Sequence, residues 1–166
     1  MAKNKGKEFE GVIRQCFERV PGVSIDRIPD QTLGNKGACN ISDFIVYKEP
    51  YEYYIECKSI HGNTLPFTNI TDKQWKGMLE KSKIDGVFAG VIVWFIDRDV
   101  TKFIPIELLQ FFKETGFKSV RYDMNTTLGN KDNIFSIIEV SGKKKRVYFD
   151  YDMEAFIKEV ERRCML

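Results

Sequence analysis

A run of β-forming residues near the middle of the sequence carries a carboxylate and an amine two positions apart. Because side chains alternate along a strand, Glu56 and Lys58 project from one face and Cys57 points to the other. Asp43 lies near the start of a second such run, and a turn is predicted at 49–52 between the two. If that turn is symmetric, antiparallel partners have residue numbers that sum to about 101, which sets Asp43 opposite Lys58 and diagonal to Glu56. The odd sum puts all three side chains on one face.

Two carboxylates placed in this way can bind one hard cation, and Mg²⁺ or Mn²⁺ prefers such oxygen ligands together with several waters. The carbonyl of Cys57 can add a ligand. A metal held there acidifies a bound water and neutralises charge on a phosphate, while Lys58 orients that water or stabilises the transition state. This is the chemistry of phosphodiester hydrolysis. The competing interpretation is a surface ladder of salt bridges, because D…ExK is a common pattern, and the order of the surrounding elements is what favours a site.

The patterns around these residues predict the elements that must hold them. Apolar residues at three- and four-residue spacing predict a helix over 7–20, and alternation predicts a strand over 23–28. A hairpin of two strands over 42–48 and 53–58 follows, then a helix over 72–83 and a strand over 87–95, which is apolar enough to lie at the centre of a sheet. The order αβββαβ predicts an α/β fold with a central mixed β-sheet flanked by helices.

The rest of the chain is predicted to elaborate this core, which spans about 6–112 of a single domain of 166 residues. A strand over 101–105 and a helix over 106–115 complete the core region. The elaboration, about 117–166, contains a strand near 119–122, a hairpin over 134–151 that turns at Gly142-Lys143, and a terminal helix over 153–164. The segment 29–40 is rich in turn-forming residues without apolar periodicity, which predicts a mobile loop.

The composition agrees with one soluble domain, since 43% of the residues are hydrophobic and 13% aromatic. No run of about 18 apolar residues is present and the basic N-terminus lacks the apolar stretch of a signal peptide, so we expect a cytoplasmic protein without a membrane partner. The four cysteines show no C-x-x-C spacing and accompany one histidine, which predicts free thiols rather than a zinc site. The net charge of +2 does not by itself indicate a polyanionic partner.

From Gly6 to Leu109 the chain resembles the PD-(D/E)XK nuclease superfamily and, within it, the RecU-like Holliday junction resolvases. The resemblance rests on five segments: Gly6-Lys7-Glu8-Phe9-Glu10, similar to the G-x-x-x-E of the family's first helix, Ser42-Asp43, Glu56-Cys57-Lys58, Leu65-Pro66-Phe67-Thr68-Asn69, and Gln74 five residues beyond Asn69. The family's basic projection before the aspartate is longer than the segment 31–40 found here. The compact size suggests a bacteriophage or mobile-element version.

This resemblance implies a Mg²⁺- or Mn²⁺-dependent endonuclease that acts as a homodimer, presents two sites to a four-way DNA junction and nicks opposed strands. Asp43, Glu56 and Lys58 would carry the chemistry. Glu10 would bind the metal or orient a ligand, although it also fits an ordinary boundary glutamate of the first helix. Gln74 would contact the scissile phosphate or the attacking water, or be a plain polar helix residue.

Seven residues near these motifs are expected to contact DNA, most of them through phosphates: Lys5, Lys7, Arg27, Lys36, Asn69, Lys73 and Lys76. The segment 31–40 is expected to supply junction selectivity, because RecU-like proteins use the equivalent stretch to enter the junction centre. Two alternatives remain open. One is a restriction- or repair-type endonuclease on the same fold, and the other is a DNA-binding module that keeps the fold without catalysis.

Overall fold

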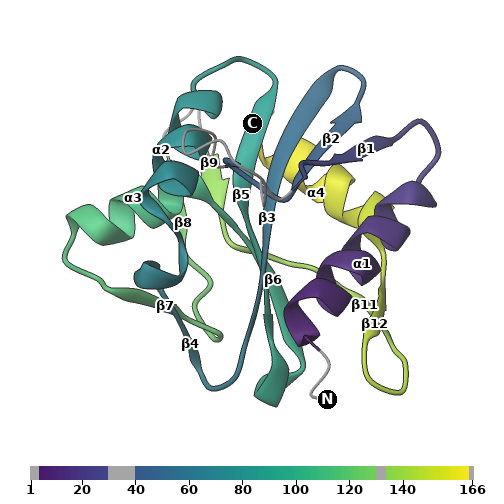
Figure 1. Cartoon of the computed structure of the whole chain (residues 1–166). Coiled ribbons are helices and arrows are strands. Elements are labelled where there is room, and N and C mark those ends of the chain that lie inside the picture. Colours follow the sequence, from purple (N-terminus) through teal and green to yellow (C-terminus); the bar gives the residue numbers. More distant parts are fainter. Residues whose placement is uncertain (1–3, 30–39, 130–133, 165–166) are drawn as a thin grey trace.

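A six-stranded mixed sheet forms the centre of the molecule in the computed structural model, which describes residues 4–29, 40–129 and 134–164 (Figure 1). Its strands, in spatial order, are β1 (Ser24–Arg27), β2 (Phe44–Lys48), β3 (Tyr51–Ile60), β5 (Val87–Phe95), β6 (Val100–Pro105) and β10 (Ile138–Glu139). β3 and β5 run parallel, and every other neighbouring pair is antiparallel. The apolar strand β5 lies inside the sheet, as predicted.

Helices cover both faces of this sheet. In Figure 1, α1 (Lys5–Glu18) and α4 (Met153–Cys164) lie on the right, and α2 (Asp72–Lys81) and α3 (Ile106–Glu114) lie on the left. The smaller elements are β4 (Thr64–Pro66), η1 (Phe67–Asn69), η2 (Ile96–Arg98), β7 (Ser119–Arg121), β8 (Thr127–Gly129), β9 (Ile134–Ser136), β11 (Gly142–Lys144) and β12 (Phe149–Tyr151). The order α1-β1-β2-β3-α2-β5 confirms the predicted αβββαβ core and its central mixed sheet with flanking helices.

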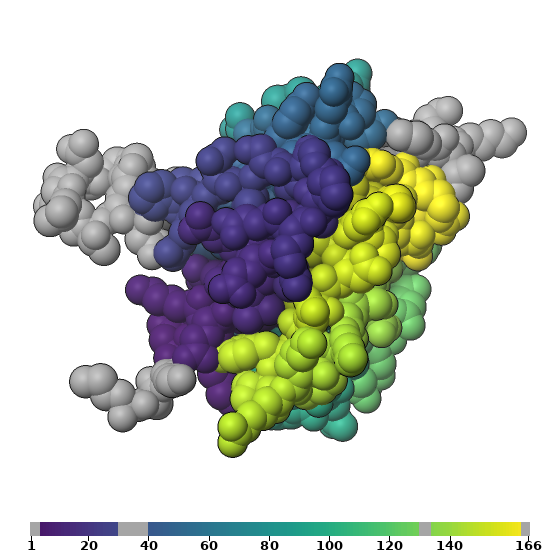
Figure 2. Space-filling view, turned by 90° about the vertical axis from the view of Figure 1, so that its right-hand side faces the viewer, coloured from purple at the N-terminus to yellow at the C-terminus, as the bar shows by residue number. Residues whose placement is uncertain are grey.

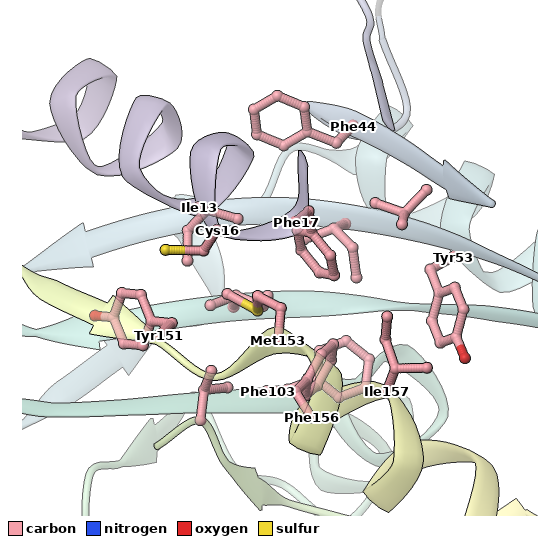
Figure 3. Packing of buried hydrophobic residues seen from close by; sticks show 14 of the residues in the cluster. Ile13, Cys16, Phe17, Phe44, Tyr53, Phe103, Tyr151, Met153, Phe156 and Ile157 are labelled. Atoms are coloured by element: carbon pink, nitrogen blue, oxygen red, sulfur yellow. The ribbon is translucent and has the colours of Figure 1, made fainter. Parts of the chain in front are cut away.

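Alternation along β3 divides its side chains between two apolar cores. Tyr53, Ile55 and Cys57 pack with α1 and α4, whereas Tyr54 belongs to the core under α2 and α3. Figure 3 shows the first core, where the ring of Phe17 from α1 lies near that of Phe156 from α4, with centroids 6.1 Å apart. The even-numbered positions 56 and 58 therefore lie on the face that α2 covers.

The turn between β2 and β3 is shorter than predicted. β2 ends at Lys48 and β3 begins at Tyr51, so Glu49 and Pro50 form the connection. Phe44 pairs with Ile55, which displaces the register by two residues from the symmetric-turn prediction. Continued by one position, this register sets residue 43 opposite residue 56 rather than residue 58. Because the displacement is even, the three predicted residues still share one face.

The predicted hairpin over 134–151 is wrong. β9 pairs with β8 and β10 pairs with β6, and β11 pairs with β12 in a shorter hairpin. Its turn lies at Lys145–Tyr148, where the Lys145 N–H donates to the Tyr148 carbonyl at 2.8 Å. Gly142 is inside the ladder instead of at the turn: a Cβ there would lie 2.7 Å from the Asp150 carbonyl oxygen, so glycine permits the close approach of the two strands.

The predicted loop at 29–40 falls mostly outside the described residues, as does Lys36. Its two ends are described. The Asn40 side-chain amide donates to the carbonyls of Ile28 at 3.2 Å and Pro29 at 2.7 Å, which ties the segment before β2 to the residues that follow β1. Among the described helices, none has the length and apolar character needed to cross a membrane.

Gly90 lies in the middle of β5, where a Cβ would meet the Ile104 carbonyl oxygen at 2.5 Å and the Phe103 ring at 2.7 Å. We expect Gly90→Ala to lower the free energy of unfolding by about 2–3 kcal/mol, because the backbone of β6 must shift to accept it. Gly11→Ala is the matched control, since its Cβ would meet nothing within 4 Å on α1. It should raise the free energy of unfolding by roughly 0.5–1 kcal/mol through helix propensity. Urea unfolding measures both, and equal stabilities would contradict the packing described for β5.

Candidate metal centre

Asp43 is fixed to β3 through both its backbone and its side chain. Its N–H donates to the Ile55 carbonyl at 3.1 Å, and its Oδ2 accepts a hydrogen bond of 2.8 Å from the backbone N–H of Cys57. The carboxylate thus accepts the N–H of Cys57 in place of a backbone carbonyl, just before β2 begins. This contact holds Asp43 beside Glu56 without using the side chain of any other residue.

Glu56 is the more buried carboxylate of the two, with 2% of its surface exposed. Its Oε1 accepts from Lys58 Nζ at 2.7 Å and from Gln74 Nε2 at 2.7 Å. Its Oε2 is buried and has no hydrogen-bond partner among the described residues. One oxygen is therefore doubly satisfied and the other is not, which is costly for a buried ionised group.

Burial, followed by the nearby carboxylate of Asp43, raises the pKa of Glu56 from 4.5 to about 7. The ammonium of Lys58 and the amide of Gln74 act in the opposite direction and do not compensate. The surrounding protein groups therefore stabilise two negative charges at this position only in part at neutral pH. A cation placed between Asp43 and Glu56 would remove that repulsion.

Gln74 is aimed at Glu56 by the N-terminus of α2. The Thr71 N–H donates to Gln74 Oε1 at 3.0 Å, and the Gln74 N–H donates to Thr71 Oγ1 at 3.2 Å, which together form a capping box. With Oε1 occupied, Nε2 is left to donate to Glu56. The predicted contact of Gln74 with phosphate or water stays a prediction, and its contact with Glu56 was missed. The T-x-x-Q spacing in the sequence indicates the capping half of this arrangement.

Glu10 lies on α1, on the opposite side of the sheet from Glu56. It accepts a hydrogen bond of 3.1 Å from the Arg27 guanidinium, and it is among the charges that raise the pKa of the buried Cys57 thiol after burial itself, Asp43 and Glu56. Across the described ranges, no three His, Cys, Asp or Glu side chains are grouped to hold an ion. The ligand role of Glu10 stays a prediction, and Arg27, expected to bind DNA, is here its ion-pair partner.

The donor set around Asp43 and Glu56 fits a hard divalent cation. The carboxylate of Asp43, just before β2, lies near that of Glu56 in β3, and the Oε2 of Glu56 is a buried acceptor with an unused lone pair. The thiol of Cys57 packs in the other core, and its raised pKa keeps it neutral, so sulfur takes no part. Oxygen ligands with the remaining positions filled by water suit Mg²⁺ or Mn²⁺.

The described residues expected to bind DNA lie on both sides of β3. Lys5 and Lys7 are exposed in the first turns of α1, and Asn69, Lys73 and Lys76 are exposed at η1 and on α2. In Figure 1, α1 and α2 lie on opposite sides of the sheet. The structure therefore brings Asp43, Glu56, Lys58 and Gln74 into one cluster, and distributes the predicted phosphate contacts around it.

No family model matches this sequence, and no curated protein matches it. Among solved structures, it is similar to the Holliday junction resolvase Hjc of Archaeoglobus fulgidus, with 16% sequence identity and a TM-score of 0.46. The match covers 63% of this chain and 75% of that chain. A likeness of this degree assigns no activity to the present chain, and membership of the RecU-like group and a phage or mobile-element origin stay predictions.

The raised pKa of Glu56 predicts how the metal-free protein responds to pH. Between about pH 4.5 and 7 the folded protein keeps a proton that the unfolded chain releases, so stability is lost as the pH rises through this window. In EDTA, the free energy of unfolding should fall by roughly 2–3 kcal/mol more for wild type than for Glu56→Gln between pH 5 and pH 8. This follows because a shift of one pKa unit corresponds to about 1.4 kcal/mol. Urea unfolding of both proteins at the two pH values measures this. Identical pH dependence would mean that Glu56 is charged without penalty.

Proposed function

We propose that this chain is a divalent-metal-dependent DNA endonuclease that nicks four-way junctions. The observation that carries the proposal is the buried Oε2 of Glu56, which has no partner in the described part of the chain and lies beside a second carboxylate, that of Asp43. Such a pair is unfavourable in a protein that binds nothing there, and it is the arrangement that a cation requires. Perturbed carboxylates of this kind gather at functional sites.

Asp43 and Glu56, with the carbonyl of Cys57, would hold Mg²⁺ or Mn²⁺. When bound, the ion acidifies a water molecule and neutralises charge that develops on the phosphate. Lys58 has a side chain that is 22% exposed, so its ammonium reaches the solvent side of the site while it contacts Glu56. From there Lys58 can orient the attacking water or stabilise the extra negative charge of the phosphate. Gln74 and the Cys57 N–H keep the two carboxylates in place.

DNA is the proposed substrate because exposed cations lie on the two helices that flank β3. Lys5 and Lys7 of α1 and Lys73 and Lys76 of α2 can bind phosphates without reading sequence. Preference for a junction is the finer part of the proposal. It depends on two copies of the chain, since two symmetric incisions need two sites and we find one such carboxylate pair in the described residues.

Asp43→Asn should reduce Mg²⁺-dependent cleavage about 10²- to 10³-fold, because it removes a charge that holds the ion. Lys58→Ala should likewise lower turnover far more than affinity. Binding to the same DNA should stay within a few-fold for both, since the surface cations are untouched. Lys83→Ala, a change at an exposed lysine after α2, is the control and should leave both quantities unchanged. Full activity of Asp43→Asn would remove this residue from the site.

The assay compares a four-way junction with a linear duplex of the same sequence, in Mg²⁺ and in EDTA. Paired nicks in the junction that disappear in EDTA support the proposal. Cleavage of the duplex at a defined sequence or lesion would instead favour the restriction- or repair-type endonuclease. Binding without cleavage in Mg²⁺ or Mn²⁺ would favour the DNA-binding module.

A homodimer is expected in solution, and light scattering after size exclusion measures it. Two copies are required for simultaneous nicks on opposed strands, so the dimer mass should be found at micromolar concentration, with or without junction DNA. A strict monomer under both conditions would contradict the paired-incision mechanism while leaving single-strand cleavage intact.

A further inference from the structure

The hairpin of β11 and β12 carries four consecutive cations that the proposed chemistry does not use: Lys143, Lys144, Lys145 and Arg146. All four are exposed, and Val147 beside them is 48% exposed at the turn. Figure 2 shows the hairpin at the lower end of this face, next to the N-terminal part of α1. A run of like charges on a short turn is self-repelling, and it attracts a polyanion.

The hairpin is fixed to the body of the protein at the end of its turn and along β12. The Tyr148 hydroxyl donates to the Glu8 carboxylate on α1, and the Tyr148 ring lies 5.4 Å from that of Trp94 in β5. Farther along β12, the hydroxyls of Tyr151 and Thr101 are 2.6 Å apart and buried. These contacts place the exposed turn of the hairpin beside α1.

The first turn of α1 lies between the hairpin and the end of β3, the strand that carries Glu56 and Lys58. A Cβ on Gly6 would lie 3.9 Å from Ser59 Oγ, so the start of α1 lies against the residue that follows Lys58. Lys5 and Lys7 are exposed on the same turn, and Glu8 there accepts the hydrogen bond from Tyr148. Exposed cations thus lie at the start of α1, beside the end of β3, and on the neighbouring hairpin.

The acidic residues near the hairpin do not neutralise it. Asp150 already pairs with Arg19 and lies 3.9 Å from Lys145, and Asp99 pairs with Lys144. Within the described part of the chain, Arg146 forms no ion pair. Exposed pairs of this kind are weak, so these lysines can exchange a carboxylate for a phosphate at little cost. The tip keeps an excess of positive charge.

We propose that the β11–β12 hairpin is a second DNA contact, which binds backbone phosphates of the duplex arm that leaves the metal centre across the start of α1. This rests on the proposed function in that the polyanion is the DNA substrate. The contact is electrostatic and independent of sequence, because lysine and arginine at an exposed turn bind phosphates as charges. It increases affinity without taking part in the cleavage step.

The test variant replaces Lys143, Lys145 and Arg146 by serine, and keeps Lys144 because that side chain packs on the Phe149 ring and pairs with Asp99. The control replaces three exposed lysines elsewhere by serine, with the same change in net charge: Lys83, Lys118 and Lys158. Binding of a labelled junction and a labelled duplex is measured in EDTA over a series of salt concentrations.

We expect the slope of log affinity against log salt to fall by about 2–3 for the hairpin variant, at roughly 0.9 per lost phosphate contact. Affinity at moderate salt should fall about tenfold, and the control should stay within twofold of wild type. The single change Arg146→Glu at the tip should also weaken binding, which keeps the test valid if the triple variant folds poorly. Equal slopes and affinities for hairpin variant, control and wild type would overturn the proposal.

Cleavage in Mg²⁺ at saturating DNA separates this inference from the proposed function. A wild-type protein that cuts DNA, with binding that does not depend on the hairpin, overturns the hairpin contact and leaves the nuclease in place. A protein whose binding depends on the hairpin but which never cuts supports the hairpin contact and overturns the proposed nuclease. When both hold, the hairpin variant should bind weakly and cut at the wild-type rate once saturated.

Discussion

The carboxylate of Glu56 is buried beside that of Asp43, and the surrounding groups are arranged around the repulsion between them. Lys58 and Gln74 both donate to one oxygen of Glu56, and the Cys57 N–H donates to Asp43. These three donors lower the cost without removing it, as the pKa of about 7 for Glu56 indicates. A buried ionised group with an unused acceptor destabilises a fold that gains nothing from it. The most direct compensation is a cation shared by the two carboxylates.

The fold meets this constraint with backbone geometry rather than with a loop. β2 begins opposite Ile55, whereas β3 continues to Ile60. Asp43, the residue before β2, can therefore direct its carboxylate to the backbone N–H of Cys57 in β3. On the other side, the capping box at Thr71 fixes the first turn of α2 and the direction of the Gln74 amide. Both contacts belong to rigid elements, which holds the pair in one geometry without a bound ligand. In the proposed function, affinity for DNA would come from exposed side chains on α1, α2 and the β11–β12 hairpin.

Sequence periodicity predicted the elements of the core and the common face of Asp43, Glu56 and Lys58, because strand alternation depends on the parity of the register and not on its value. The register itself was displaced by two residues, since apolar alternation continues through Tyr51 and does not reveal how few residues form the turn. The prediction of a hairpin over 134–151 is wrong for a related reason, because the side chains of a short strand alternate in the same way whichever strand it pairs with. Gly142, taken as a turn residue, instead allows close strand approach. The orientation of Gln74 toward Glu56 depends on tertiary packing that no local pattern contains.

The most direct test of the shared cation is an anomalous diffraction map from crystals of the wild-type protein soaked in Mn²⁺ without DNA. We predict one strong peak between the carboxylates of Asp43 and Glu56, at about 2.1 Å from an oxygen of each, as oxygen ligation of an ion of this size requires. The same soak of Glu56→Gln should lose the peak while the protein fold is unchanged. A wild-type map without density between the two carboxylates at millimolar Mn²⁺, or with the ion bound elsewhere, would contradict the account.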